Sequence, residues 1–284
     1  MRQLRFLYKI APAAPFFMLV MLFLMIPFAG MIISSFRHPE TGVFTLKNYH
    51  DVFTRLIYTV AIRNSVRIAF ISSTTGLGIS FFTALSLTRL SSKTRARYMP
   101  VLNMTQGFVG FPLAFSFIIM VGRSGFLVLL FRHLGWGLLD NYNLYSGDGL
   151  IPLFIYFAIP LGTLLMVPGF SAVRQEWIDT AALLQANGFQ FWLRVGIPVL
   201  SSTLLGTFSV LFADSITTFT TVYLVMSTNY PTLPIKVFSM FSGDLRQQVE
   251  LGSALSVVMV LIILAVICST SLLRKALNRW RFSS

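Results

Sequence analysis

Residues 149–173 read GLIPLFIYFAIPLGTLLMVPGFSAV and contain no Asp, Glu, Lys or Arg. A helix needs about 20 consecutive apolar residues to cross the hydrocarbon core of a bilayer, and this stretch is long enough. Because the hydrocarbon core offers no water to pair the backbone groups, a single crossing segment must pair them internally as a helix. The stretch therefore predicts a membrane-spanning helix, which we place at about 149–172.

Similar charge-free runs occur along the rest of the chain. A seventh crossing over 215–235 is possible by length, but Asn229, Pro231 and Pro234 disfavour a helix there. We therefore predict an all-α polytopic membrane protein in which residues 1–284 form a single transmembrane domain. The predicted helices are about 10–36, 64–88, 98–122, 149–172, 198–225 and 251–273.

The composition agrees with a membrane protein. The chain is 55% hydrophobic and only 11% charged, whereas soluble domains are about 25% charged. Its net charge of +13 would suggest a nucleic-acid partner in a soluble protein. Here the basic residues lie mainly in short gaps between apolar runs, which is typical of anchoring at an anionic leaflet of the lipid bilayer. We expect no nucleic acid, and with one cysteine (Cys268) and scattered histidines, no metal site and no catalytic cluster.

The distribution of charge predicts that both termini are cytoplasmic. Six spans place the termini on one side, and most of the 22 Lys and Arg residues lie in the segments on that side. Arg63 and Arg67 flank the second span on the other side and weaken the bias. The predicted cytoplasmic cations are Arg2, Arg5, Lys9, Arg89, Lys93, Arg95, Arg97, Arg174, Arg194, Arg274, Lys275, Arg279 and Arg281. The predicted outer acids are Glu40, Asp51, Asp140, Asp148, Asp244 and Glu250.

Small residues and helix breakers occur inside the predicted spans. A stripe of small residues, each four positions apart, indicates close approach of another helix, in this chain or in a second one. Gly110 and Pro112 mark either a functional kink or the helix breaker common in membrane proteins. The stripe consists of Ser72, Gly76, Ser80 and Ala84.

The segment between the fourth and fifth spans reads SAVRQEWIDTAALLQANGFQFWLRVGIP from Ser171 to Pro198. Acidic residues suit the first turn of a helix, and Asn187-Gly188 is a stop signal. We therefore predict a surface helix at about 176–187, with a face of small side chains. Lipid-bound helices favour bulky apolar groups instead, so the small face indicates docking into a protein groove.

This segment resembles the EAA loop of binding-protein-dependent ABC importer permeases, which have the MetI-like fold. In that family the pattern is roughly E-A-A-x-x-x-G-A, an aromatic residue, then basic-Val-x-Leu-Pro. Asp179 stands at the Glu position, Trp192 at the aromatic position, and Gln185 at the Gly position, with the nearest glycine at Gly188. By this resemblance the predicted coupling residues are Glu176, Asp179, Thr180, Ala181, Ala182, Gln185, Ala186, Gly188, Arg194 and Pro198.

Other motifs extend the resemblance over most of the chain. Thr45-Leu-Lys-Asn-Tyr49 and Asn64-Ser65 are similar to the family's T-L-x-N-Y and N-S. The stretch 229–237 resembles the polyamine-type branch, whose members often carry an acid in the fifth span, as Asp214 does here. Permeases for iron, thiamine and phosphonate look alike in this region. The resemblance favours a polyamine-like solute and leaves these others open.

The resemblance implies a set of partners in the bacterial cytoplasmic (inner) membrane. These are ATPase subunits that bind ATP-Mg, a second permease subunit (a different chain in the polyamine branch), an extracytoplasmic substrate-binding protein and the lipid bilayer. The sequence has no Gly-Lys dipeptide and so lacks the G-x-x-x-x-G-K phosphate loop. We therefore expect that this chain binds no cofactor and is not an enzyme.

Asp214 is the most costly residue in the predicted spans, at about 2.5–3.5 kcal/mol for a charged group at mid-helix. Thr217, Thr218 and Thr221 follow at helical spacing on the same face. This face either lines the translocation path or forms a structural hydrogen-bond network, and we weigh both equally. A rival class is a secondary transporter or channel with Asp214 as its ion site.

Overall fold

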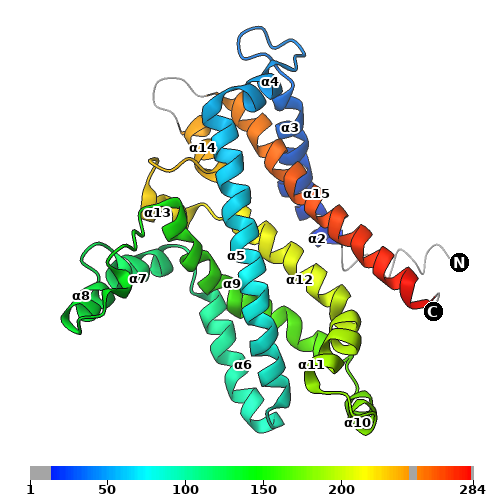
Figure 1. The fold of residues 1–284 in the computed structure, drawn as a ribbon. Helices are drawn as coiled ribbons and strands as arrows, with labels where there is room; N and C mark the ends of the chain where they lie inside the picture. The colour runs from blue at the N-terminus through cyan, green and yellow to red at the C-terminus, as the bar shows by residue number, and fades with distance from the viewer. Residues whose placement is uncertain (1–13, 243–247, 283–284) are drawn as a thin grey trace, which may run out of the picture. The chain divides into compact units, whose positions relative to one another are not determined.

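The structure, a computed structural model, describes residues 14–242 and 248–282. Within these ranges it contains six helical stretches that are long and apolar enough to cross a membrane (Figure 1). The predicted all-α class with six spans is therefore confirmed. Residues 10–13 of the first predicted helix, and Arg2, Arg5, Lys9 and Asp244, lie outside the described residues. The six stretches are Pro15–Ser35, Leu56–Arg89, Phe111–His133, Gly147–Phe170, Gly188–Thr217 and Val249–Leu277.

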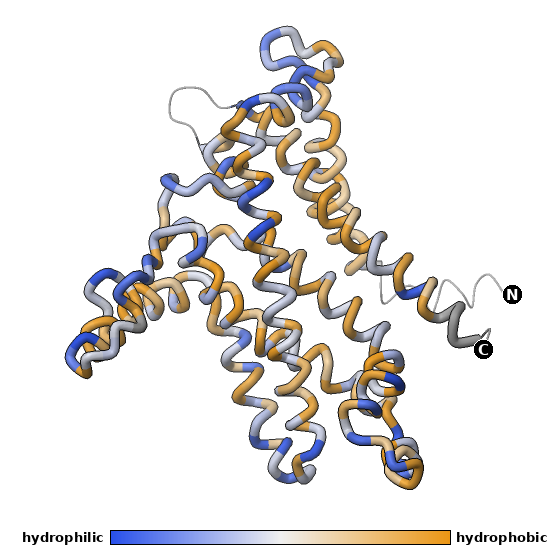
Figure 2. Tube along the Cα trace, viewed as in Figure 1, coloured by the Kyte–Doolittle hydropathy of each residue, from blue (hydrophilic) through white to orange (hydrophobic). Residues whose placement is uncertain are grey.

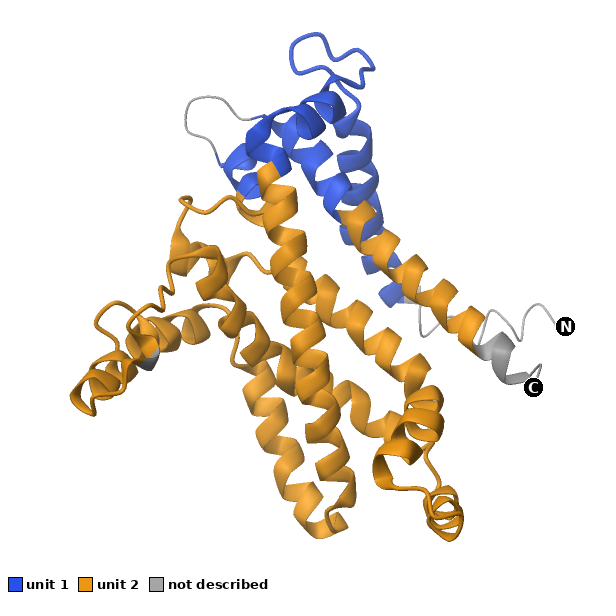
Figure 3. Cartoon of the chain, viewed as in Figure 1, with its two compact units in different colours: residues 1–59, 236–259 blue, residues 60–235, 260–284 orange. Residues whose placement is uncertain are grey.

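The chain divides into two compact units, where the sequence predicted a single domain (Figure 3). Unit 1 comprises residues 1–59 and 236–259, and unit 2 comprises residues 60–235 and 260–284. The long helices α5 (Leu56–Arg89) and α15 (Val249–Phe282) begin in unit 1 and continue in unit 2.

Unit 1 contains the first span, which is α2 (Ala14–Val20), the π-helical turn η2 (Met21–Met25) and α3 (Ile26–Ser35). It also contains α4 (Lys47–Thr54) and most of α14 (Leu233–Phe241). The buried amide of Asn48 donates hydrogen bonds to the carbonyls of Ser35 (2.9 Å) and Arg37 (2.8 Å). The hydroxyl groups of Tyr49 and Ser35 lie 2.7 Å apart. The Asn-Tyr pair of the TLKNY motif thus fastens α4 to the end of the first span.

Unit 2 is built around α9 (Gly147–Phe170), which packs against α6 and α12, while α13 packs against α7. The buried side chains of Leu153, Phe154 and Phe157 on α9 supply much of its core. The other elements of unit 2 are α6 (Ser92–Gly107), α7 (Phe111–Val121), α8 (Phe126–His133), η3 (Gly137–Leu139), α10 (Gln175–Leu183), α11 (Gly188–Phe191), η4 (Trp192–Gly196), α12 (Ile197–Thr217) and α13 (Thr220–Met226).

The stripe of small residues on α5 faces α9 of the same chain. A Cβ atom added to Gly76 would lie 2.7 Å from the Cβ of Ala158, and one added to Gly162 would lie 2.5 Å from the Ser80 hydroxyl oxygen. The Ser80 hydroxyl also donates a 3.0 Å hydrogen bond to the carbonyl of Ile159. The close approach that the spacing predicted is therefore an intramolecular contact, which settles the choice that the sequence left open.

Substitution Gly76→Ala is expected to lower the free energy of unfolding by about 1–3 kcal/mol, because an extra methyl group must be forced into a filled contact. Gly78→Ala, on the same helix, is the matched control, since no atom of a neighbouring element lies within 4 Å of a Cβ at that position. Denaturant unfolding in detergent, followed by tryptophan fluorescence, measures the difference. Ala158→Gly should restore stability in the Gly76→Ala background. Equal stability of the two single variants would contradict this packing.

Two predicted helices are divided in the structure. In place of one helix over 98–122, α6 ends at Gly107 and α7 begins at Phe111. Gly110 has φ +70°, a conformation that glycine adopts without strain, and Pro112 has no amide hydrogen to continue α6. In place of one helix over 198–225, α12 ends at Thr217 and α13 begins at Thr220.

The break after α12 has a local cause in its threonines. The hydroxyl of Thr217 donates to the carbonyl of Ala213 (2.8 Å), and that of Thr218 donates to the carbonyl of Asp214 (2.8 Å). Such side-chain bonds compete with helical backbone bonds, and Thr218 takes an extended conformation with ψ 109°. The mainly apolar composition of 198–225 concealed this break.

The N-S motif at Asn64-Ser65 meets the stretch 229–237 in unit 2, although Asn64 and Pro231 are 167 residues apart. The amide of Asn64 donates to the carbonyl of Pro231 (3.0 Å), and the hydroxyl of Ser65 accepts from the backbone N–H of Leu233 (2.8 Å). The Ser65 hydroxyl thereby satisfies one of the free N–H groups at the start of α14. These bonds hold the segment that follows α13 against α5.

Candidate functional site

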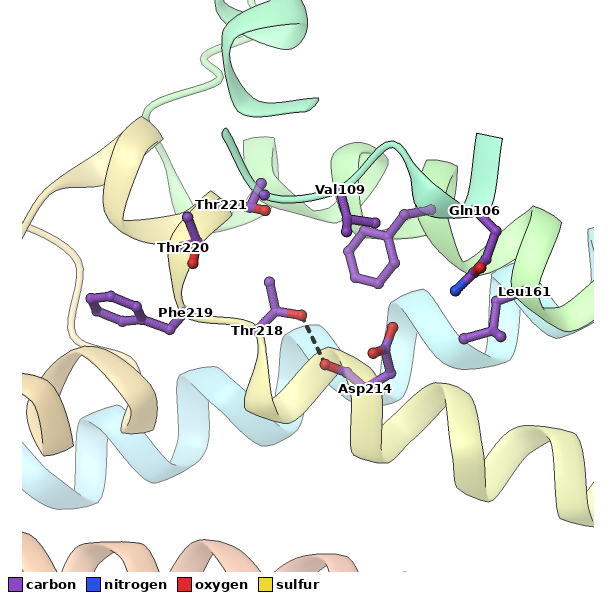
Figure 4. A pocket seen from close by; sticks show the side chains of 10 residues that line it. Gln106, Val109, Leu161, Asp214, Thr218, Phe219, Thr220 and Thr221 are labelled. Atoms are coloured by element: carbon purple, nitrogen blue, oxygen red, sulfur yellow. Dashed lines mark hydrogen bonds between the residues drawn. The ribbon is translucent and has the colours of Figure 1, made fainter. Parts of the chain in front are cut away.

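The two helix breaks meet at one pocket in unit 2. A Cβ atom on Gly110, in the break after α6, would lie 3.8 Å from the Cγ2 of Thr220, at the start of α13. The two breaks therefore lie close together. Together with α9 they line a half-open cavity of about 250 Å³ (Figure 4). Its lining residues are Gln106, Val109, Gly110, Phe157, Leu161, Asp214, Thr218, Phe219, Thr220 and Thr221.

The Asp214 carboxylate points into this cavity, between Thr218 and Leu161 (Figure 4). In the part of the chain that the structure describes, the ion pairs are Arg55–Asp51 (2.9 Å), Arg67–Asp148 (2.6 Å) and Arg132–Asp140 (3.0 Å), and none includes Asp214. The hydroxyls of Thr217 and Thr218 donate to backbone carbonyls and not to the carboxylate. Asp214 is thus an unpaired carboxylate facing a cavity, which favours the pathway hypothesis over the structural network.

The structure brings together most of the predicted path residues, and it adds others. Asp214, Thr218 and Thr221 line the cavity, whereas Thr217 does not. Helical spacing assumed one helix through residue 221, but Thr221 reaches the cavity from α13, beyond the break. Sequence reasoning missed the side chains of Gln106, Phe157, Phe219 and Thr220. The signal for Gln106 was the Gly110–Pro112 break, which carries the end of α6 to the cavity.

The predicted coupling helix is α10, and it projects from unit 2 without burying any residue. It is shorter than the predicted range 176–187. Thr180 donates its hydroxyl to the carbonyl of Glu176 (2.7 Å), and Gln175 donates to the Asp179 carboxylate (3.0 Å). At its end the leucine side chains Leu183 and Leu184 are 85% and 77% exposed. Apolar groups this exposed outside a predicted span indicate a surface that contacts another protein or the membrane.

The predicted stop at Asn187-Gly188 is wrong, because α10 already ends at Leu183. Gln185 has φ +57°, and the N–H groups of Gln185 and Ala186 donate to the carbonyls of Ala182 (3.0 Å) and Ala181 (2.9 Å). This is the Schellman pattern, in which glycine usually takes the left-handed position. The family's glycine position is therefore the residue with positive φ, and glutamine occupies it here.

Asn187 begins the next helix instead of ending this one. Its side chain accepts from the backbone N–H of Gln190 (2.8 Å), and the Gln190 side chain accepts from the backbone N–H of Asn187 (3.0 Å). The two bonds form a capping box for α11, which starts at Gly188.

Gln185→Gly is expected to stabilise the end of α10, because a left-handed residue with a Cβ costs about 1–2 kcal/mol. A gain of about 1 kcal/mol corresponds to roughly fivefold slower hydrogen exchange of the local amides, which mass spectrometry resolves. Gln185→Ala serves as the control, since it removes the side chain but keeps the Cβ and should give no protection. Equal protection in both variants would show that the backbone is not strained there.

Trp192 links the coupling segment to the membrane helices. Its ring lies 5.5 Å from that of Phe81 on α5 and 5.9 Å from that of Phe170 on α9. Gly196 leaves room for this ring, since a Cβ there would overlap it. Arg194 is exposed, and Pro198 stands in the first turn of α12, where its missing N–H costs little. The segment that follows α10 is therefore joined to α5 and α9 by an aromatic contact.

Beside α10 lies an apolar hollow at the start of α12. Trp177, Thr180, Ala181 and Leu184 form one wall, and Val195 and Val199 form the other. The small face predicted for the coupling helix thus contributes Ala181 to this hollow.

No group of three or more His, Cys, Asp or Glu placed to hold a metal ion occurs among residues 14–242 and 248–282.

The chain is similar to known membrane permeases over most of its length, although no family model matches it. It is 24% identical to the inner membrane ABC transporter permease protein YcjP of Escherichia coli, covering 80% of this chain and 78% of that protein. It is 23% identical to the putative ferric transport system permease protein FbpB 1 of Haemophilus influenzae, covering 84% of this chain. The chain spans only 38% of the length of FbpB 1.

A solved structure shows the same fold. It is a bacterial ABC transporter involved in the import of the acidic polysaccharide alginate, and one of its chains superposes with a TM-score of 0.76. The alignment covers 97% of this chain and 99% of that one at 14% identity. The chain thus has the fold of a membrane chain of an ABC importer, and its sequence is similar to that of an inner-membrane ABC transporter permease.

Proposed function

We propose that this permease moves a small polar solute into the cytoplasm within a larger importer. ATPase subunits hydrolyse ATP-Mg, an extracytoplasmic binding protein delivers the solute, and a second permease subunit, a different chain, completes the path. The observation that carries the proposal is helix α10, which buries none of its residues and is followed by the exposed Leu184 and by Trp192, whose ring contacts α5 and α9. An ATPase groove that receives α10 would pull on both helices.

The cavity supports a cationic solute, with a polyamine-like compound favoured. An unpaired carboxylate attracts a cation, and the rings of Phe157 and Phe219 in the same lining add cation–π contacts. Threonine hydroxyls and the Gln106 amide supply further polar contacts. Iron, thiamine and phosphonate remain alternative cargoes; one relative is named for ferric transport.

A second candidate function is ion-coupled transport, because the same unpaired Asp214 would serve as an ion site. This alternative gives no role to the exposed α10 and its aromatic link. Purification separates the two proposals. An importer is expected to be recovered with an ATPase whose activity rises when the external binding protein is added with its ligand. Recovery without any ATPase, together with ion-driven uptake, would support the alternative.

A further inference from the structure

The turn between α5 and α6 carries cations that have no counter-charge. Arg89 lies in the last turn of α5, and Lys93, Arg95 and Arg97 lie in the first turns of α6. We call these four residues the basic turn. No Asp or Glu occurs anywhere in residues 52–139. Within the part of the chain that the structure describes, no ion pair or side-chain hydrogen bond involves any of the four. The positive charge is therefore free to attract an anionic group.

Exposed apolar side chains lie near the basic turn on both helices. Lys93, Arg97, Val101 and Met104 share one face of α6 by their spacing, and all four are exposed. Met104 is 76% exposed, and on α5 Phe82 is 68% exposed, seven residues before Arg89 on the same face. Figure 2 shows hydrophilic residues gathered at the turn, where α5 ends and α6 begins.

The spacing places the cations at the rim of the apolar surface. With a rise of 1.5 Å per residue, Arg97 lies only about 6 Å along the α6 axis from Val101. Side chains of this length bury their methylene groups against apolar surface and extend the charge toward the polar boundary. Apolar side chains exposed beside a membrane span are expected to contact hydrocarbon, which would place the adjoining charges at the depth of the lipid phosphates.

We infer that the basic turn binds the phosphate groups of anionic phospholipids in the leaflet on the predicted cytoplasmic side. Clusters of Lys and Arg directly beside a membrane span attract acidic headgroups. An acidic protein surface is the competing occupant, but a protein would have to enter the headgroup layer to reach charges that adjoin lipid-facing side chains. The site goes beyond the proposed function, because it holds for any cargo and any energy source.

The test uses the purified complex in neutral detergent, titrated with dioleoyl phosphatidylglycerol and dioleoyl phosphatidylcholine under native mass spectrometry. We expect phosphatidylglycerol to bind more tightly, with a preference that falls as salt rises. Each basic residue near a membrane surface contributes about 1 kcal/mol, so each Gln substitution should weaken phosphatidylglycerol binding about fivefold. Lys93→Gln with Arg97→Gln should weaken it about 25-fold on the same basis.

Control variants separate charge from general damage. Arg37→Gln with Lys47→Gln removes two cations from the predicted outer side of unit 1 and should leave the preference unchanged. Arg89→Lys, Arg95→Lys and Arg97→Lys together keep the charge and should retain binding. Equal affinity of the unaltered complex for the two lipids would overturn the inference without any variant.

Two further outcomes would also overturn it. Competition by free glycerol 3-phosphate at the concentrations that saturate the lipid would assign the turn to a soluble phosphate compound. Loss of the ATPase subunit in the Lys93→Gln, Arg97→Gln variant, with lipid preference intact, would assign the turn to a protein contact.

Discussion

Replacing Leu183 and Leu184 by Asp is expected to separate the chain from its ATPase subunit. Both side chains are uncovered at the end of α10, and burying a leucine stabilises an interface by about 1.5–3 kcal/mol. Losing two such contacts should weaken ATPase binding at least about a hundredfold. Pull-down of the ATPase, followed by titration of the separated subunits, measures the change, and ATP-dependent uptake should be lost with it.

Leu46→Asp is the matched control for this prediction. Leu46 is also an exposed leucine, but it precedes α4 on the predicted outer side, in unit 1. It should leave ATPase binding intact, since the proposed ATPase site is on the predicted cytoplasmic side. If the Leu183→Asp, Leu184→Asp variant binds the ATPase as well as the unaltered chain does, α10 is not the coupling helix.

Asp214→Asn and Asp214→Ala are expected to lower uptake of a cationic solute by about 10- to 150-fold, because a hydrogen bond to a charged group contributes about 1.5–3 kcal/mol. The asparagine variant keeps the shape of the side chain and removes only the charge. ATPase binding through α10 should persist in both variants. Radiolabelled uptake in cells that express the complete importer gives the measurement.

Asp148→Asn provides the corresponding control on the outer side. Asp148 pairs with Arg67 at 2.6 Å, and both side chains are exposed. Exposed pairs contribute only about 0–1 kcal/mol, so uptake should change little. Normal uptake by both Asp214 variants would remove Asp214 from any essential role in the path. Equal losses in the Asp214 and Asp148 variants would point to a general effect of removing negative charge.

The spans were predictable because the length of a charge-free apolar run can be read directly from the sequence. Charge-free runs predicted the number of spans, but the third span lies at Phe111–His133 and not at about 98–122. The divisions of 98–122 and 198–225 were not predictable from hydropathy. One depends on the positive φ of Gly110 and the other on threonine hydroxyls that bond back to carbonyls. Single residues determine where these helices break, and a hydropathy average over a window of residues does not detect them.

The residues of the candidate site were also only partly predictable from the sequence. Asp214 stood out because an acid within a span is costly, and Thr218 followed from it by helical spacing. Gln106 comes from a distant part of the chain, so only the folded backbone brings it to the cavity. The coupling segment was found through its motif, but the role of Gln185 required the dihedral angle. The contact of Asn64 with Pro231 likewise joins motifs that no local pattern connects.

The most direct measurement is solute uptake into proteoliposomes that contain the purified complex, with the binding protein and its ligand outside. ATP would be supplied at the face of the vesicle where the ATPase subunits lie. We predict uptake that requires ATP, the ATPase subunit and the binding protein together, and that disappears in the Leu183→Asp, Leu184→Asp variant. Uptake by this chain alone, driven by an ion gradient without ATP, would contradict its role as an ABC importer permease.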